Sequence, residues 1–113
     1  MDHEVPLYSR SVATERGHIY LIGGFMKRAE QYLNTCYLYD EVFATLDKKA
    51  NSFYSYADHS VCAIESFIYV AGTFINNKVF PFCERYDSQK NKWKVIAPLN
   101  VPRSGSALCS FKN

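Results

Sequence analysis

The segment Cys36-Tyr37-Leu38-Tyr39-Asp40 returns 47 residues later as Cys83-Glu84-Arg85-Tyr86-Asp87. Upstream of it, the heptapeptide HIYLIGG at 18–24 returns at an offset of 49 as FIYVAGT at 67–73. The two offsets differ by two, so one loop of the first copy is two residues longer. A period of this length makes each copy one supersecondary unit that must stack on a neighbour to bury a core.

Both copies are predicted to form short strands. The predicted strands cover 11–15, 19–23, 36–40 and 44–47 in the first copy, and 60–64, 67–71, 82–87 and 92–96 in the second, with a further strand at 107–111. These runs are rich in β-branched and aromatic residues and are cut by Gly, Asn, Asp and Ser, a pattern typical of antiparallel all-β structure. Ile19–Ile22 is apolar without alternation, which predicts burial on both faces, as in the blade of a propeller.

The unit resembles a kelch repeat. The hallmarks are a glycine pair that closes a strand, a later tyrosine and a tryptophan, found here as Gly23, Gly24, Tyr39 and Leu46, then Gly72, Thr73, Tyr86 and Trp93. Leu46 stands in place of the tryptophan, Thr73 in place of the second glycine, and Leu7 and Tyr56 where arginine is usual. The resemblance implies an all-β partial β-propeller with two four-stranded antiparallel blades at about 7–52 and 53–101. The first strand of a third blade would occupy about 102–113.

Each hallmark residue has a physical role to fill. Gly23 and Gly72 are expected where the backbone needs a positive φ or a close approach by another segment. Tyr39, Tyr86 and Trp93 are expected to be plates between neighbouring sheets, each with a hydroxyl or N–H that needs a partner.

Composition excludes several function classes. The formal net charge is +2, and no run of Lys or Arg indicates nucleic acid or an anionic membrane as a partner. No apolar stretch is long enough to span a bilayer. The first residues lack the pattern of a signal peptide, and no Asn-x-Ser/Thr acceptor occurs. We therefore expect a cytoplasmic protein.

The four cysteines are Cys36, Cys62, Cys83 and Cys109. They occupy equivalent positions in pairs, at 36 and 83 and at 62 and 109, and no C-x-x-C spacing occurs. We expect buried thiols that fill the core rather than metal ligands, and we predict no metal and no cofactor.

Catalysis is not predicted. The histidines His3, His18 and His59 occupy unrelated repeat positions, and neither a zinc-binding histidine spacing nor a nucleophile elbow occurs. The alternative is a fragment of a propeller enzyme similar to the copper oxidases that share the kelch fold. Such a site would need two Tyr and two His from distant blades.

Topology locates the expected binding face. In an antiparallel blade with strands a to d, the b–c loop and the d–a junction lie at the same end. The b–c loops are expected at 25–35 and 74–81. Candidate binding residues in these loops and junctions are Lys27, Arg28, Tyr32, Tyr54, Tyr56, Asn76, Asn77, Lys78 and Arg103.

Aromatic, Arg and Asn side chains on the loops of a rigid scaffold are enriched in protein interfaces. The resemblance implies a protein-interaction module that binds a protein or peptide here, as in a substrate adaptor or a cytoskeletal binder. The alternative is that these aromatic side chains fill the channel mouth or pack on the next blade.

Two blades and one strand do not close a propeller, which has about 4–8 blades. We expect further kelch repeats in cis in a longer protein. The alternative is self-association, in which three copies would supply six blades through head-to-tail contacts.

Overall fold

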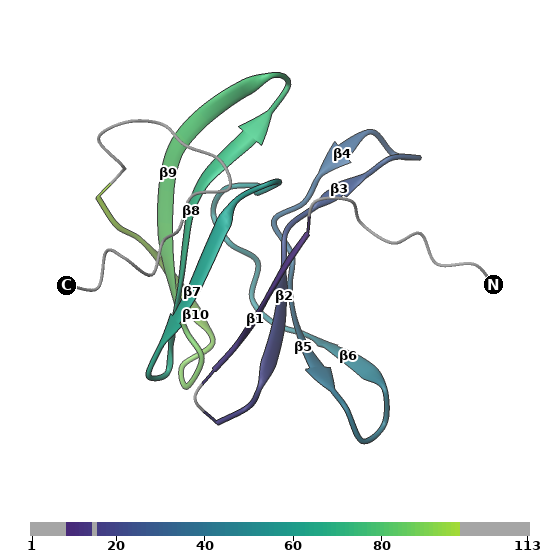
Figure 1. Cartoon of the computed structure of the whole chain (residues 1–113), viewed down its shortest axis with the longest axis vertical. Helices are drawn as coiled ribbons and strands as arrows, with labels where there is room; N and C mark the ends of the chain where they lie inside the picture. Colours follow the sequence, from purple (N-terminus) through teal and green to yellow (C-terminus); the bar gives the residue numbers. More distant parts are fainter. Residues whose placement is uncertain (1–8, 15, 98–113) are drawn as a thin grey trace.

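The computed structural model describes residues 9–14 and 16–97, which form ten strands and two four-stranded antiparallel sheets (Figure 1). The first sheet contains β1 (Arg10–Ala13), β2 (Ile19–Ile22), β5 (Cys36–Asp40) and β6 (Thr45–Lys48) in that order. The second contains β7 (Ser60–Ile64), β8 (Phe67–Ile75), β9 (Lys78–Asp87) and β10 (Lys92–Val95) in the order β10-β9-β8-β7. A separate hairpin joins β3 (Phe25–Met26) to β4 (Gln31–Tyr32).

The prediction of an all-β fold with two four-stranded antiparallel units is confirmed, and the two units do not form a closed propeller. The predicted bounds of 36–40 and 60–64 match β5 and β7. The predicted strand at 107–111 lies outside the described residues. In the part of the chain that the structure describes, no helix is long and apolar enough to cross a bilayer.

The main core lies between the two sheets, which stand side by side in Figure 1. In β2, Tyr20 and Ile22 are buried against the second sheet, whereas Ile19 and Leu21 are only half-buried. The prediction that this strand is buried on both faces is therefore wrong, because only one of its faces has a sheet packed on it among the described residues. Ile68, Val70, Tyr86 and Trp93 supply the buried side chains of the second sheet.

Tyr86 and Trp93 are plates between the sheets, as predicted. Their ring centroids are 4.9 Å apart, and Tyr86 meets Tyr20 of the first sheet edge-on at 5.7 Å. The Trp93 indole N–H donates to the carbonyl of Ala50 at 2.7 Å, and the Tyr86 hydroxyl donates to the Asn91 side chain at 2.6 Å. Both polar groups thus have the partners that burial demands.

Tyr39 and Leu46 occupy the equivalent places in the first sheet but have a different environment. They are paired across β5 and β6 as Tyr86 and Trp93 are across β9 and β10. They lie on the face turned away from the second sheet, where Tyr39 is half-buried and Leu46 is 50% exposed. The expectation that Tyr39 packs between two sheets is wrong among the described residues, because the face of β5 that carries it is not the face packed on the second sheet.

The two hallmark glycines have positive φ, as predicted: +67° for Gly23 and +68° for Gly72. A Cβ added at Gly23 would lie 2.4 Å from the carbonyl oxygen of Tyr56, so that position also needs the close approach that only glycine allows. Gly72 does not end its strand. It sits inside β8 at a register shift between Ala71 and Thr73.

The cysteines are core residues. Cys36 and Cys83 are free thiols, buried as predicted, and burial raises the pKa of Cys36 to about 12 and that of Cys83 to about 11. Cys62 is buried as well but is disulfide-bonded, so the expectation of a thiol is wrong there. Cys109 lies outside the described residues.

Candidate protein-binding face

The β3–β4 and β8–β9 hairpins project at one end of the molecule, at the top of Figure 1. The second hairpin has a two-residue turn, Asn76-Asn77, in which both residues have positive φ (52° and 65°). Such a turn matches the twist of the flanking strands, and asparagine tolerates it well. The predicted loop at 74–81 is therefore wrong: β8 and β9 continue to the turn and leave only these two residues unpaired.

The two hairpins are joined to each other. Within the first, the rings of Phe25 and Tyr32 are 4.7 Å apart. The backbone N–H of Asn76 at the tip of the second donates to the Tyr32 hydroxyl at 3.2 Å. The hydrogen bond ties the tip of the second unit to the predicted b–c loop of the first, so the two hairpins form one surface.

Three aromatic rings stack below this surface. Tyr54 stacks on Phe82 with centroids 3.9 Å apart and an angle of 5° between the rings, and Phe82 stacks on Phe80 at 5.4 Å and 7°. Next to Tyr54 in the chain, Phe53 is 66% exposed, and Phe74 near the hairpin tip is 38% exposed. Apolar area is thus available to a partner on a rigid base.

A buried carboxylate anchors the chain that connects the sheets. Glu84 is 0% exposed and accepts hydrogen bonds from the backbone N–H groups of Phe53 (2.8 Å) and Tyr54 (3.0 Å) and from the Tyr56 hydroxyl (2.6 Å). Burial is the main cause that raises the pKa of Tyr56, and the bond to Glu84 adds to it. Tyr56 is 0% exposed, so it cannot offer a surface to a partner, and we remove it from the candidate binding residues.

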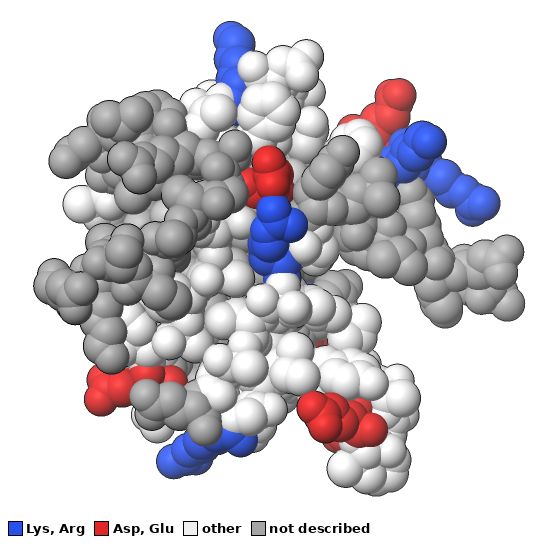
Figure 2. Space-filling view, viewed as in Figure 1, with Lys and Arg blue, Asp and Glu red and all other residues white. Residues whose placement is uncertain are grey.

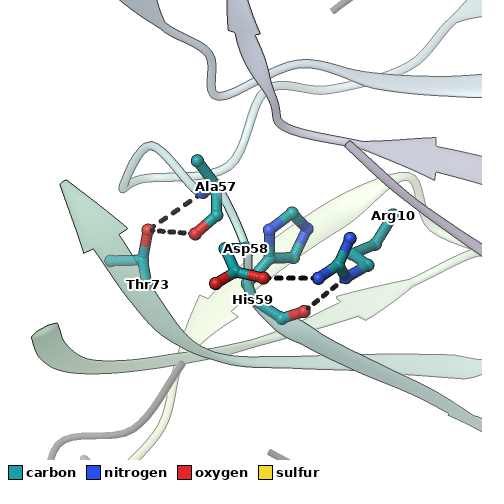
Figure 3. Close-up of polar contacts among 5 residues, drawn as sticks. All are labelled: Arg10, Ala57, Asp58, His59 and Thr73. Atoms are coloured by element: carbon teal, nitrogen blue, oxygen red, sulfur yellow. Dashed lines mark hydrogen bonds and ion pairs between the residues drawn. The ribbon is translucent and has the colours of Figure 1, made fainter. Parts of the chain in front are cut away.

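The next residues of the connection are fixed by two further side chains (Figure 3). Thr73 accepts a hydrogen bond from the Ala57 N–H at 3.0 Å and donates one to the Ala57 carbonyl at 3.3 Å. Arg10 of β1 pairs with Asp58 at 2.5 Å and donates from Nε to the carbonyl of His59 at 3.0 Å. Thr73, which stands where the repeat usually has glycine, therefore makes hydrogen bonds to the connection that glycine could not make.

We call the two hairpins together with residues 53–58 the hairpin face. Figure 2 shows basic side chains at the hairpin tips. Lys27, Arg28 and Lys78 are exposed at these tips, and Glu30 is the acidic residue among them. The face thus combines exposed aromatic area with mainly positive charge.

Apart from the buried Tyr56, the predicted binding residues fall into three groups. Lys27, Arg28, Asn76, Asn77 and Lys78 are exposed at the tips, Tyr32 and Tyr54 are half-buried behind them, and Arg103 lies outside the described residues. Sequence reasoning missed the anchoring roles of Glu84 and Thr73. The signal at Glu84 was its departure from the repeat, since a carboxylate stands there where the first copy has Tyr37.

Metal ligands do not gather among the described residues, where no group of three or more His, Cys, Asp or Glu side chains could hold an ion. A cavity of about 600 Å³ opens between the sheets at the opposite end, where its lining includes Arg16, His18, Lys49 and Ser88. It does not reach the hairpin face.

Comparison with known proteins finds a kelch motif in part of the chain. The family model described as the Kelch motif matches residues 6–45, the first of the two copies. Kelch-like protein 4 of Homo sapiens is 32% identical over 53 residues, which make up 47% of this chain and 7% of that protein. The chain thus matches only a small part of the length of this relative. The predicted resemblance to kelch repeats is confirmed.

Proposed function

We propose that this chain of kelch repeats is a non-catalytic interaction module that binds a protein or peptide through its hairpin face. The observation that carries the proposal is the bond between Tyr32 and Asn76, which turns two hairpins from different units into one surface. A surface shared by two units can bury more area on a partner than either hairpin alone, and stable interfaces bury about 800 Å² on each side.

The polar side chains of this face support binding rather than catalysis. Glu84 uses its carboxylate to hold the connection, Thr73 holds Ala57, and Asp58 is paired with Arg10. These groups fix the backbone beneath the surface. What remains for a partner is aromatic area and the positive charge of Lys27 and Lys78, which favours a partner that presents acidic and apolar side chains.

Larger roles follow from the same proposal. A kelch segment of this kind would recruit a substrate to an adaptor or bind a cytoskeletal protein, with further kelch repeats in cis or further copies covering the free face of the first sheet. The cytoplasmic setting stays a prediction.

The test compares two variants of the chain. Phe53→Ser combined with Lys78→Glu changes exposed residues of the hairpin face, and Lys90→Glu changes an exposed residue of the β9–β10 turn at the other end. A partner is first captured with the parent chain, purified and measured by calorimetry. We expect the first variant to weaken its binding at least about tenfold and the control to leave binding within about twofold. Equal binding by both variants would refute the hairpin face as the binding surface.

A further inference from the structure

A second exposed apolar feature lies at the opposite end of the molecule, in the β5–β6 turn at the lower right of Figure 1. Val42 is 84% exposed and Phe43 is 75% exposed. We call these two residues the turn tip. Large apolar side chains this exposed on a tight turn are uncommon, since turns favour small and polar residues.

The fold does not require apolar residues at the turn tip. In the first unit, a carboxylate oxygen of Asp40 accepts hydrogen bonds from the two N–H groups of Val42-Phe43 at 2.9 and 3.2 Å. In the second unit, Asp87 accepts the same two bonds from Gln89-Lys90 at 3.0 and 3.2 Å. The same turn forms with polar side chains, so the apolar pair in the first unit calls for another explanation.

A neighbouring blade does not supply that explanation. The first sheet covers the second sheet at the hallmark position, where Trp93 is 9% exposed. Gln89 and Lys90 nevertheless remain exposed in the turn beside it. A blade stacked in the same way on the first sheet would cover Leu46 but would leave Val42-Phe43 outside.

An acidic hollow lies beside the turn tip. Its volume is about 310 Å³, and its lining is Gly17, His18, Leu38, Tyr39, Asp40, Glu41 and Asp47. Figure 2 shows acidic side chains gathered at this end of the first sheet. Among the described residues, neither Glu41 nor Asp47 forms an ion pair. The basic Arg16 and Lys49 line the neighbouring cavity between the sheets, which shares His18 and Leu38 with the hollow.

We propose that the turn tip and this hollow form a second binding site, for a protein segment that carries a basic residue close to an apolar one. A Lys or Arg side chain of the segment would enter the hollow among the three carboxylates. An apolar side chain nearby would pack on Val42 and Phe43. Charge complementarity sets the choice of a basic segment, and the exposed tip sets the need for an apolar neighbour. The site is independent of the hairpin face and goes beyond the function proposed above.

The experiment uses fluorescence anisotropy with a labelled peptide of about twelve residues. In this peptide each Arg has a Leu two or three positions away, and the other residues are Gly and Ser. In matched peptides, Glu replaces every Arg or Ser replaces every Leu. The purified chain carries either its own turn or Val42→Gln with Phe43→Gln. The turn accepts polar residues, as the second unit shows, and the variant adds no charge that would repel the peptide.

The Arg–Leu peptide is expected to bind the parent chain at least about tenfold more tightly than the turn variant, and more tightly than either matched peptide. The Phe53→Ser variant of the hairpin face should bind it as the parent does, which separates this site from the proposed function. The proposal is overturned if the turn variant binds equally well, or if the Glu peptide binds equally well. It is also overturned if the turn variant abolishes a concentration-dependent dimer of the parent, since a second copy would then be the occupant.

Discussion

At the scale of single residues, the buried polar side chains of Glu84 in β9 and His59 at the end of the connection have opposite environments. Glu84 has three hydrogen-bond donors around its carboxylate, whereas both ring nitrogens of His59 lack a partner among the described residues. Burial, and then the positive charge of Arg10, lower the pKa of His59 to about 3, with the nearby carbonyl of Ile22 opposing the shift. His59 is therefore a neutral side chain that the fold protects from protonation.

The first prediction is a loss of stability as the pH falls. Histidine binds its proton near pH 6.5 in the unfolded chain and only near pH 3 in the folded one, so the unfolded state binds more protons between these values. As the pH is lowered from about 6.5, the free energy of unfolding should decrease by up to ~1.4 kcal/mol for each pH unit. Urea unfolding at pH 7 and pH 5 measures this loss.

His59→Phe should reduce the loss of stability between pH 7 and pH 5, because a ring of similar size replaces the imidazole without a titrating group. His18→Gln, at an exposed position, should leave the loss as it is in the parent chain. An unchanged slope in His59→Phe would show that other groups cause the pH dependence.

At the scale of elements, the connection between the sheets docks on the end of β2 through a backbone contact. The N–H of Gly24 donates to the Tyr56 carbonyl at 2.6 Å, and the Tyr56 N–H donates to the carbonyl of Leu33 at 3.0 Å. Gly23 lies directly against the carbonyl of Tyr56. The close approach therefore sets where residues 53–58, the middle of the hairpin face, are held.

The second prediction separates the energetic cost of a positive φ from the cost of a steric clash with the Tyr56 carbonyl. Gly17 and Gly23 both have positive φ, at +83° and +67°, but a Cβ at Gly17 would meet nothing within 4 Å. Gly17→Ala should cost only the strain, about 1–2 kcal/mol. Gly23→Ala should cost at least about 2 kcal/mol more, because the Cβ would collide with the Tyr56 carbonyl and displace the connection. Urea unfolding gives both costs, and equal values would show that the connection moves aside freely.

The strands could be predicted from the sequence better than the turns and connections that join them. The copies at 36–40 and 83–87 align without a gap, and β5 follows the predicted bounds. The loop predicted at 74–81 was wrong because Asn76 and Asn77 accept positive φ, so the flanking residues stay paired. The burial of Tyr56 could not be seen either, because its partner Glu84 lies 28 residues away and no local pattern connects them.

At the scale of the whole molecule, the direction of the hallmark pairs makes the two units unequal. Tyr86 and Trp93 pack on the first sheet, while Tyr39 and Leu46 face away from the second. The same repeat position should therefore carry a different share of the stability in each unit, although the sequence treats the two as equivalent. What a hallmark position contributes to stability depends on whether another sheet covers its face, and not on the residue pattern of that face.

The third prediction compares the two equivalent positions. Trp93→Ala should lower the free energy of unfolding by about 3–5 kcal/mol, because it leaves a cavity between the sheets and removes the bond to Ala50. Leu46→Ala should lower it by less than about 1 kcal/mol, because that side chain is 50% exposed. Urea unfolding at two protein concentrations measures both. A large cost for Leu46→Ala that grows with protein concentration would contradict the expected asymmetry, because it would mean that a second copy covers the free face of the first sheet in solution.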